Sequence, residues 1–568
     1  MHGRVALRVR TACSSTPYIP GPKTASCLLS RKPRTKKGTE HRLAETALRS
    51  TLALGTSRVY STLPSGAGKR LEGSSAHRTE PDTAQLVLSD AQKKTIYALS
   101  TPPGKAGVAV VRISGPDASE AWRNLVQTHG KGKGKSRESE PEPWKMHRCR
   151  VVHPTTGDVL DDGLAVFFKG PRSFTTEDVL ELHVHSGRAI IASVLNAIAC
   201  LPFCRPAEHG EFTRRAFEGG RLDLTQVEGL RDLIDAETET QRKLALRTAE
   251  GATRARLEQL RNEIIHCMAL VEALIDFGEG EDIEEGVYDQ ARERVQKLRS
   301  TISHHLSDNR RGEIMRSGIR LAIFGPPNAG KSSLLNFLAQ REAAIVTPIP
   351  GTTRDILELA LDIGGLPVIV ADTAGLRKTD DAVEKIGVER ARQLVESSDV
   401  SLCVLPAPEV LVKSSRGHWE LRPPPSLEHL IKEDTLVLLN KSDLLPHDGQ
   451  PLTVQSLPSK AIWHVSLTSG EGTAEFIKGF SETLQHRYNS LSEGGHRVEE
   501  PLITHARHRT HLENALQFLD AFLRTPPEDV VLAAEELRYA AQAIGKISGL
   551  IDVEDVLDAV FRDFCIGK

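Results

Sequence analysis

One stretch restricts the fold more than any other: RLAIFGPPNAGKSSLLNFL, at residues 320–338. Leu321–Phe324 form an apolar run typical of a buried strand, the segment GPPNAGKS follows at once, and a helical pattern comes next. The spacing G-x-x-x-x-G-K-S lets backbone N–H groups wrap nucleotide phosphates at a helix N-terminus. Lys331 is placed to reach the β- and γ-phosphates, and Ser332 to offer its hydroxyl to Mg²⁺. The stretch therefore predicts a nucleotide-binding α/β domain with a parallel sheet.

A second strand pattern identifies the base. LVLLNKSD, at residues 436–443, places Asn440 and Asp443 at the end of a strand. A carboxylate there can accept hydrogen bonds from both N1–H and the exocyclic amine of guanine, and adenine lacks that pair of donors. The predicted base is therefore guanine. The segment SLTSGEG, at residues 466–472, would complete the base pocket through Ser466, Leu467 and Thr468.

Two further stretches would complete the metal and γ-phosphate site. GTTRD, at residues 351–355, supplies a second metal-ligating hydroxyl, which we assign to Thr353. VIVADTAG, at residues 368–375, is a strand that ends in an acid of the Mg²⁺ site, Asp372, with a glycine placed to sense the γ-phosphate.

The hydrolytic step must differ from that of many small GTPases. Those enzymes orient water with a Gln directly after the DxxG glycine, whereas this chain has Leu376 there. No arginine finger is evident either. Glu384 is a candidate for orienting water, and the alternative is that it is a solvated helix charge.

The pattern of apolar residues changes twice along the chain. Residues 92–210 contain β-rich runs broken by Gly and Pro, which indicates an α+β domain. After Phe212, apolar residues recur every three or four positions for about fifty residues, too long a stretch for one helix without breaks. Residues 505–564 are helical again. We expect a helical domain interrupted by an inserted domain, divided as follows: transit peptide 1–60, disordered linker 61–91, N-terminal domain 92–211, helical domain 212–318, inserted Ras-like P-loop domain 319–494 and helical domain again 495–568.

The first ninety residues differ in composition from the rest. They contain 15 of the 73 Lys and Arg residues but only 6 of the 75 Asp and Glu residues. The remainder of the chain therefore has 58 basic and 69 acidic residues. The chain has no acid before Glu40 and many Ser and Thr, a composition typical of a mitochondrial transit peptide; a basic disordered tail is the alternative. The remainder is acidic, so any nucleic-acid binding must use local basic patches. No apolar run is long enough for a membrane span.

The chain ends FCIGK, with Cys565 fourth from the end. A Cys at this position has the outline of a prenylation signal, but Gly567 and the terminal Lys568 fit that signal poorly. Two alternatives are a buried structural Cys and a thiol delivered to a site elsewhere in the fold.

Taken together, these motifs resemble one family, the MnmE (or TrmE) tRNA modification GTPases. The resemblance runs from about residue 93 to 568. It depends most on TPPGKAGVAVVRISG, EFTRRAFEGGRLDLTQVEGL and the terminal FCIGK, and it also includes DTAGLRKTDDAVEKIGVER. With the basic N-terminal segment, the chain resembles a mitochondrial member.

The resemblance implies a potassium-dependent GTPase that acts with an FAD-dependent flavoprotein of the MnmG/Mto1 type. In the family, the pair modifies carbon 5 of the wobble uridine of tRNAs, forming taurinomethyluridine in mitochondria. The one-carbon donor is 5-formyltetrahydrofolate or a related folate, bound by the N-terminal domain, which also forms a homodimer. These properties imply a location in the mitochondrial matrix. A ribosome-assembly or regulatory GTPase switch is the alternative, although such a factor would be expected to carry an RNA-binding module instead.

Site residues follow from the resemblance by matched position. The resemblance implies that Glu384 orients water and that Cys565 is needed for tRNA modification. The residues implied to contact folate are Arg112, Glu181, Arg221 and Lys568. The implied Mg²⁺ ligands are Ser332 and Thr353, and the implied K⁺ ligands are Asn328, Thr347, Ile349 and Thr352. The predicted GTP-binding residues are Asn328, Ala329, Gly330, Lys331, Ser332, Ser333, Thr347, Pro348, Ile349, Pro350, Gly351, Thr352, Thr353, Asp372, Thr373, Ala374, Gly375, Asn440, Lys441, Asp443, Ser466, Leu467 and Thr468.

Three features fall outside the family pattern or leave alternatives open. The fifth GTPase motif reads SL, where SA is usual. Residues 400–426 carry a Pro-rich insertion, which we expect to be a disordered surface loop. His183 and His185 lie on one face of a strand, which is compatible with a metal site but fits a structural or folate-adjacent role better.

Overall fold

The fold is known from a computed structural model, which describes most of the chain after residue 93. The described residues are 94–128, 141–277, 286–308, 310–341, 359–370, 384–413, 419–445, 461–489, 501–551, 557, 560–562, 564, 566 and 567. The predicted transit peptide and linker lie outside them. Among the described helices, none is both long and apolar enough to cross a membrane.

The first part of the chain forms a seven-stranded sheet, in the order β3-β4-β5-β6-β2-β1-β7. Neighbouring strands are antiparallel except β1 and β7. One face packs against α1 (Ala118–Leu125) and α2 (Arg188–Ala199) through side chains such as Val111 and Leu182. The strands are β1 (Thr95–Leu99), β2 (Ala106–Ser114), β3 (Val126–Thr128), β4 (Met146–Val152), β5 (Val159–Phe168), β6 (Val179–Ser186) and β7 (Cys204–Pro206). The predicted α+β domain is confirmed.

Helix α3 (Glu211–Glu218) covers part of the other face of this sheet. Its fully buried Phe212 packs with Ile96 and Ala98 of β1. These two residues alternate with Tyr97, which belongs to the core on the opposite face. The first helix of the amphipathic stretch, α3, therefore packs on the N-terminal sheet, and the helical domain begins after it.

The long amphipathic stretch breaks into separate helices, as its length predicted. Helices α4 (Leu224–Asp235) and α5 (Glu239–Ala249) each begin with a capping box, Asp223 with Gln226 and Thr238 with Gln241. The helix α6 (Ala252–Phe277) follows, and after it come α7 (Val287–Leu306) and the short α8 (Arg311–Ser317).

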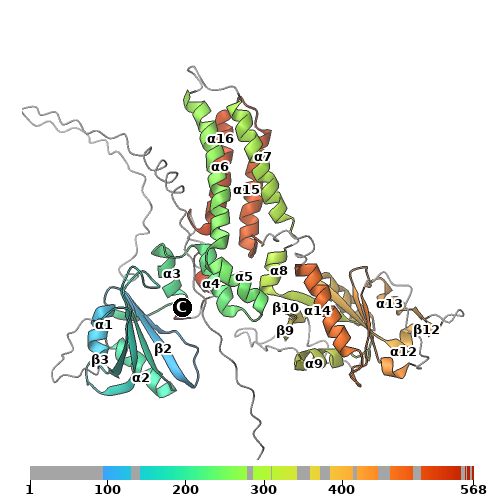
Figure 1. The fold of residues 1–568 in the computed structure, drawn as a ribbon, viewed down its shortest axis with the longest axis horizontal. Coiled ribbons are helices and arrows are strands. Elements are labelled where there is room, and N and C mark those ends of the chain that lie inside the picture. The colour runs from blue at the N-terminus through green and yellow to red at the C-terminus, as the bar shows by residue number, and fades with distance from the viewer. Residues whose placement is uncertain are drawn as a thin grey trace, which may run out of the picture. The chain divides into compact units, whose positions relative to one another are not determined.

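Four long helices form one bundle, although they come from two distant parts of the sequence. Helices α15 (Ala506–Arg524) and α16 (Val530–Ser548) pack along α6 and α7 (Figure 1). The shared core includes Ile264, Val295, Leu519 and Ile544, all at most 1% exposed. The prediction that the last helices pack back on the earlier ones is confirmed.

The inserted domain contains a six-stranded sheet, in the order β15-β14-β11-β8-β10-β9. The strands run parallel, as predicted, except the edge strand β9, which is antiparallel because a two-glycine turn, Gly364–Gly365, reverses the chain. The elements are β8 (Ile319–Phe324), α9 (Lys331–Arg341), β9 (Leu359–Ile363), β10 (Leu366–Val370), α11 (Glu384–Glu396), β11 (Val400–Pro406), β14 (Leu436–Asn440), β15 (Ile462–His464) and α14 (Thr473–Asn489).

The prediction of a disordered loop at residues 400–426 is wrong over the part that the structure describes. The chain continues from β11 into α12 (Ala407–Val410), the hairpin β12 (Leu411–Lys413) and β13 (Trp419–Leu421), and α13 (Pro425–Glu428). The reason is apolar packing, which the prolines obscured. Leucines of this segment, including Leu421 and Leu427, are buried with Leu405 and Leu439 of the sheet.

A buried ionic cluster joins the two sequence halves of the helical domain. The Glu228 carboxylate of α4 accepts hydrogen bonds from both Arg507 (3.0 Å) and His508 (2.7 Å) of α15. One turn further along α4, Asp232 lies 3.4 Å from Arg316, whose Nε donates to the carbonyl of Thr504 at 2.9 Å. The cluster therefore ties the chain leaving for the inserted domain to the chain returning from it.

Burial and pairing set the protonation states in this cluster. Burial opposes ionisation of Glu228, but His508, His505 and Arg507 outweigh it and hold the pKa of Glu228 far below its usual range. For Asp232 burial dominates and raises the pKa to about 6, although Arg316 opposes the shift. Burial also lowers the pKa of His505 to about 3.

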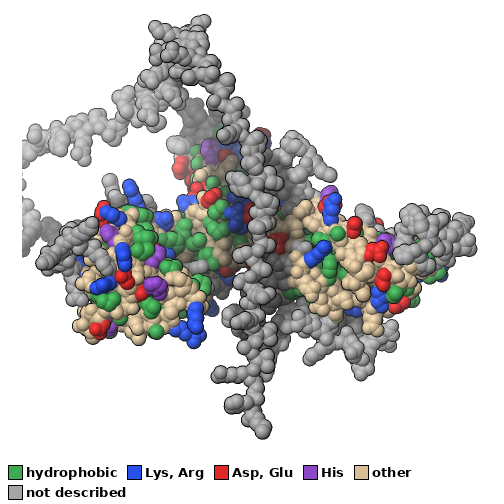
Figure 2. Space-filling model, turned by 60° about the horizontal axis from the view of Figure 1, so that its bottom comes forward, with side chains coloured by type: hydrophobic (Ala, Val, Ile, Leu, Met, Phe, Trp, Pro, Cys, Tyr) green, Lys and Arg blue, Asp and Glu red, His purple; other side chains and the backbone are tan. Residues whose placement is uncertain are grey.

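Basic and acidic side chains are mixed on the described surface in view in Figure 2, without a large area of one sign. The chain after residue 90 is acidic overall, with 58 Lys+Arg against 69 Asp+Glu, but the acidic side chains in this view are not gathered into one area. Any attraction of a polyanion to this face must therefore come from local groups rather than from a broad positive field.

Replacing Asp232 by Asn is expected to make stability fall more steeply on acidification. In the wild type, Asp232 binds its proton earlier in the folded than in the unfolded chain, so it adds stability as pH falls from about 6 to 4. His505 does the opposite over this range, because the unfolded imidazole takes up a proton first. In the variant nothing opposes the His505 contribution, so the free energy of unfolding should fall by up to about 1.4 kcal/mol for each pH unit of acidification. Thermal melting from pH 7 to pH 4 measures this.

The matched control is Asp235→Asn, since Asp235 is an exposed residue of the same helix, with 65% of its side chain accessible. If the melting temperature of Asp232→Asn changes with pH as that of the wild type does, the proposed opposing effects of Asp232 and His505 on stability are contradicted.

Candidate functional site

The predicted phosphate-binding loop lies between β8 and α9, at the carboxyl edge of the inserted sheet. Gly325 (φ 151°) lies so close to the next strand that a Cβ would stand 2.1 Å from the Val404 carbonyl oxygen. Asn328 (φ 58°) and Gly330 (φ 101°) also adopt positive φ, which turns successive N–H groups toward the interior of the loop. The helix begins directly after this turn, with Leu334 N donating to Gly330 O at 2.9 Å.

Lys331, the first residue of α9, folds back over its own loop. Its ammonium donates to the carbonyls of Gly325 (2.9 Å) and Pro326 (2.8 Å), and burial lowers the pKa of Lys331. These carbonyls hold the Lys331 ammonium over the phosphate loop. A bound phosphate group would replace them as the partner of the ammonium.

One side-chain amide, that of Asn440, connects the segments predicted to bind the nucleotide base. Asn440, buried at the end of β14, donates through Nδ2 to Ala329 O (2.8 Å) and accepts from Leu467 N (3.2 Å) through Oδ1. Asn440 therefore connects all three predicted segments, the phosphate loop, the NKSD segment and the SLT segment. Sequence reasoning placed Asn440 in the base pocket but missed this bridging contact.

The neighbouring residues complete the same edge. Lys441 has positive φ (64°), and Ser442 N donates to Val465 O at 3.1 Å, which holds the following turn against β15. Asp443 is exposed at the start of this turn. Ser466 is fully buried, and its hydroxyl accepts from Ser469 N at 3.1 Å.

Several predicted residues lie outside the part of the chain that the structure describes. They are Thr347, Pro348, Ile349, Pro350, Gly351, Thr352, Thr353, Asp372, Thr373, Ala374, Gly375, Cys565 and Lys568. Glu384 is the first residue of α11, but its side chain is not among those described. The roles assigned to these residues remain predictions.

A second polar site lies on the N-terminal sheet. Strand register places Arg112 of β2 opposite Glu181 of β6, and the guanidinium contacts the carboxylate at 2.9 Å and 3.0 Å. Two aromatic rings flank the guanidinium, Phe174 at 5.5 Å and Phe212 at 5.7 Å. Both charged side chains are half-buried, with 21% and 17% of the side chain exposed.

Burial raises the pKa of Glu181, but His183 and Arg112 outweigh it, so the net pKa lies below the usual range. His183 lies 3.6 Å from this carboxylate, whereas His185 pairs with Asp161 at 2.9 Å. Among the described residues, the one His and acid grouping close enough to hold a metal is Glu228 with His505 and His508, elsewhere in the fold. The two strand histidines therefore have carboxylate partners instead.

Arg221 reaches the same region from the segment after α3. Its guanidinium donates to the carbonyls of Arg172 (3.0 Å) and Ser173 (2.8 Å), next to Phe174. Three of the four predicted folate-contacting residues are thus described, and Arg112, Glu181 and Arg221 gather around one loop. The aromatic partners of Arg112 were missed, and alternation along β2 could have indicated only that Arg112 avoids the apolar core.

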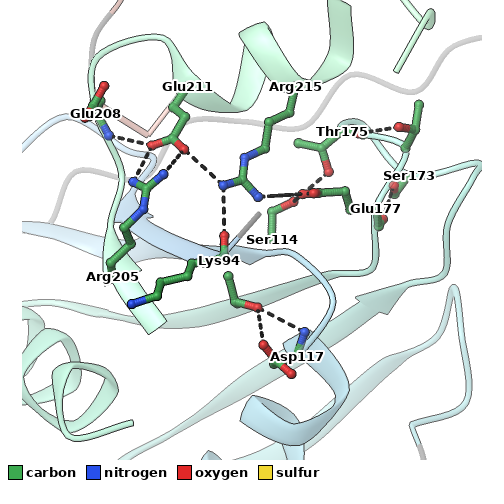
Figure 3. Close-up of polar contacts among 12 residues, drawn as sticks. Lys94, Ser114, Asp117, Ser173, Thr175, Glu177, Arg205, Glu208, Glu211 and Arg215 are labelled. Carbon is green, nitrogen blue, oxygen red and sulfur yellow. Dashed lines mark hydrogen bonds and ion pairs between the residues drawn. The ribbon is translucent and has the colours of Figure 1, made fainter. Parts of the chain in front are cut away.

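A network of ion pairs holds α3 on this sheet (Figure 3). Arg215, with 7% of its side chain exposed, pairs with Glu177 and Glu211 at 3.0 Å and donates to Lys94 O at 2.8 Å. Arg205 pairs with the same Glu211 at 2.6 Å. Because Phe212 is the next residue after Glu211, this network also fixes one of the rings beside Arg112.

The last residues of the chain lie against both the helical domain and the N-terminal sheet. Leu557, Phe561 and Phe564 pack on Leu224 and Val227 of α4, so this segment docks on the helical domain. Beyond them, Ile566 forms an antiparallel bridge with His209, and Gly567 O accepts from Ser100. The described tail residues therefore reach the N-terminal sheet of the same chain.

Comparisons with known proteins match this arrangement. A family model described as the MnmE helical domain matches residues 224–565, and one described as the GTP-binding protein TrmE N-terminus matches residues 95–221. The chain is 44% identical over 486 residues to the mitochondrial 5-taurinomethyluridine-tRNA synthase subunit GTPB3 of Danio rerio, covering 84% of this chain and 93% of that protein.

Two further relatives are similar over comparable lengths. The chain is 47% identical to the tRNA modification GTPase MnmE of Parvibaculum lavamentivorans over 478 residues, covering 84% of this chain and all of that protein. It is 41% identical to the mitochondrial GTPB3 subunit of Homo sapiens over 484 residues, covering 84% of this chain and 93% of that one. The similarity thus includes both the sheet with Arg112 and the phosphate loop.

Replacing Asn440 by Ala is expected to weaken guanine-nucleotide binding by about tenfold to a hundredfold. The change removes the donor to Ala329 O and the acceptor for Leu467 N together, so two segments of the site lose their common support. Binding of a fluorescent GDP analogue measures this. Asn336→Ala, an exposed amide on α9, is the control, and unchanged affinity in Asn440→Ala would contradict the bridging role.

Proposed function

The chain belongs to the MnmE/TrmE family of tRNA modification GTPases, and from this premise we propose that it hydrolyses GTP to support modification of carbon 5 of the wobble uridine in mitochondrial tRNAs. The product of that modification is taurinomethyluridine. The observation that carries the proposal is similarity over nearly the whole length of both mitochondrial and bacterial relatives. The geometry of the phosphate loop and Asn440 supports the GTPase part.

In this proposal the phosphate loop binds the β- and γ-phosphates through its backbone N–H groups and Lys331. Lys331 would exchange its two carbonyl partners for phosphate oxygens, with no large movement of its side chain. Ser332 and Thr353 would hold Mg²⁺, and bound Mg²⁺ would neutralise charge that develops on the phosphates. Asp372 and Gly375 belong to the same site by their place in the sequence.

We propose that a bound K⁺ replaces the missing arginine finger. Asn328, exposed in the phosphate loop with a positive φ, offers a side-chain amide oxygen, the kind of ligand that hard cations prefer. The remaining proposed K⁺ ligands are Thr347, Ile349 and Thr352. Glu384 would orient the attacking water in place of the Gln that Leu376 replaces.

The N-terminal sheet would bind the folate donor. A folate carries carboxylates, which suit Arg112 or Arg221, and a heterocycle with N–H donors, which suits the carboxylate of Glu181. The partly exposed ring of Phe174 beside Arg112 adds flat apolar surface for a bound heterocycle, and the fully buried Phe212 supports Arg112 from the core side. Lys568 would join this site from the tail, and Cys565 would serve the modification chemistry.

The working form would be a homodimer in the mitochondrial matrix, acting on tRNA together with an FAD-dependent flavoprotein. Within each chain, we propose that the inserted GTPase domain spans residues 319–494. The alternative of a ribosome-assembly switch has no support from the N-terminal domain, because residues 95–221 match the TrmE N-terminal family model.

GTP hydrolysis is expected to be at least about tenfold faster in K⁺ than in Na⁺, because a correctly sized cation would supply the charge of an arginine finger. Steady-state phosphate release in matched chloride salts measures this. Asn328→Ala should lose the preference, and Asn336→Ala should keep it. Equal wild-type rates in the two salts would refute the cation proposal.

Replacing Cys565 by Ser is expected to leave GTP hydrolysis within about twofold and to abolish wobble-uridine modification, because the thiol is assigned to the modification site and not to the nucleotide site. Nucleoside mass spectrometry of mitochondrial tRNA from complemented null cells measures the modification. Cys200→Ser, which removes an exposed thiol of the N-terminal domain, is the control. Loss of both activities in Cys565→Ser would favour a structural role instead.

A further inference from the structure

A polar cavity of about 110 Å³ lies in the helical domain, in the corner formed by α4, α5 and α8 (Figure 1). Two guanidinium groups and two carboxylates line it, those of Arg231, Arg316, Asp232 and Asp235. Leu244 and Ala245 of α5 add apolar surface to the same lining. A cavity of this volume has room for a small molecule but not for a nucleotide or a folate.

The corner is fixed by the way the helices end and begin. Helix α4 ends at Asp235, the extended backbone of Ala236 turns the chain, and the capping box at Thr238 starts α5. Gln241 of α5 then donates to the carbonyl of Arg316 at 2.9 Å, which holds α8 against the pair. The charged side chains are therefore carried by helices whose positions are already set, and little ordering is needed on binding.

The opposite charges in the cavity are held apart. Arg231 Nε lies 3.6 Å from the Asp235 carboxylate, and Arg316 Nη1 lies 3.4 Å from that of Asp232. A charge-assisted hydrogen bond of ideal geometry is about 2.7–2.9 Å long. The Nε of Arg316 donates to the carbonyl of Thr504 at 2.9 Å, so its guanidinium cannot simply move closer to Asp232. Both pairs thus leave room for shorter bonds to a ligand.

The charge pattern restricts what the cavity can bind. An inorganic anion would meet the two carboxylates, and a metal ion would meet the two guanidinium groups, each at a cost in repulsion. A small zwitterion, with an ammonium at one end and an anionic group at the other, satisfies both kinds of lining group. The apolar side chains of Leu244 and Ala245 suit the carbon atoms between its charges.

We propose that this cavity binds taurine, the amino sulfonate whose skeleton appears in taurinomethyluridine. The sulfonate would contact Arg231 and Arg316, and the ammonium would lie between Asp232 and Asp235. This inference rests on the proposed function, because the product identifies taurine, whereas the cavity supplies the charge pattern. A sulfonate has three acceptor oxygens, enough for two guanidinium groups, and a carboxylate has two. The cavity is assigned binding of the amine reactant and no bond-making step.

The first test is direct binding of taurine to the full-length protein. Saturation-transfer NMR on the taurine methylene protons measures the Kd, which we expect to be on the order of 1 mM for so small a ligand. Arg231→Gln should weaken binding by about fivefold to tenfold, because one charge-assisted hydrogen bond is lost. Arg538→Gln, which alters an exposed arginine paired with Glu535 on α16, is the matched control and should bind as the wild type does.

Ligand analogues separate the two ends of the cavity. Asp235→Asn should weaken taurine binding by about fivefold but should not weaken binding of ethanesulfonate, which lacks the ammonium. Arg231→Gln should weaken binding of both ligands. Three results would each overturn the site: no saturation transfer to taurine, as expected of a cavity that holds only water; equal weakening of both ligands by Asp235→Asn; or β-alanine binding as tightly as taurine.

The second test measures taurinomethyluridine in mitochondrial tRNA from complemented null cells. Arg231→Gln should give less of this nucleoside at low taurine, and added taurine should restore it, because a weaker site fills at a higher concentration. A deficit that added taurine does not restore would overturn the role of the cavity in modification. If wild-type complementation does not raise taurinomethyluridine at all, the proposed function fails instead, and the NMR measurements still decide whether the cavity binds taurine.

Discussion

The structure depends on a buried carboxylate at the point where an interrupted domain is rejoined. Glu228 meets Arg507 and His508 across 279 and 280 residues of sequence, inside the helical domain. A buried ion pair of this kind contributes little net stability over an apolar contact, but removing one partner would leave an unpaired buried charge. In this fold the pairing joins α4 to α15, and the neighbouring pair of Asp232 with Arg316 joins α4 to the chain that leaves for the inserted domain.

The inserted sheet connects this ionic cluster to the nucleotide site. Its first strand, β8, is separated by one residue from α8, whose Arg316 belongs to the same cluster, and it ends at the phosphate loop. Gln241 of α5 donates to the carbonyl of Arg316 at 2.9 Å, and α5 packs along α4. The opposite end of α4 carries Leu224 and Val227, on which the terminal segment sits. The helix pair α4 and α5 therefore lies between the base of the GTPase sheet and the terminal residues Leu557, Phe561 and Phe564.

The sequence alone predicted those parts of the fold and site that depend on a short local motif. GPPNAGKS demands a tight loop of N–H groups between strand and helix, so its fold and the place of Lys331 could be predicted, and the breaks in the amphipathic stretch followed from its length. The pairing of Arg112 with Glu181 needed the register of two strands, and resemblance alone supplied both residues. The contacts of Glu228 and His209 join positions hundreds of residues apart, and no local periodicity encodes them. The segment after β11 was mispredicted because its prolines suggested a loop, whereas its leucines, spaced for burial, decided the outcome.

The bundle made of α6, α7, α15 and α16 has a consequence for biosynthesis. When α6 and α7 have left the ribosome, their apolar stripe, with Ile264 and Val295, has no covering until the last sixty or so residues are made. The entropy cost of closing so long a loop grows only slowly with its length, and a folded inserted domain shortens the effective distance further. The delay is thus kinetic: a nascent chain must keep half of a hydrophobic core exposed while another domain folds. A cell short of chaperones should therefore lose this protein to aggregation before folding rather than to unfolding afterwards.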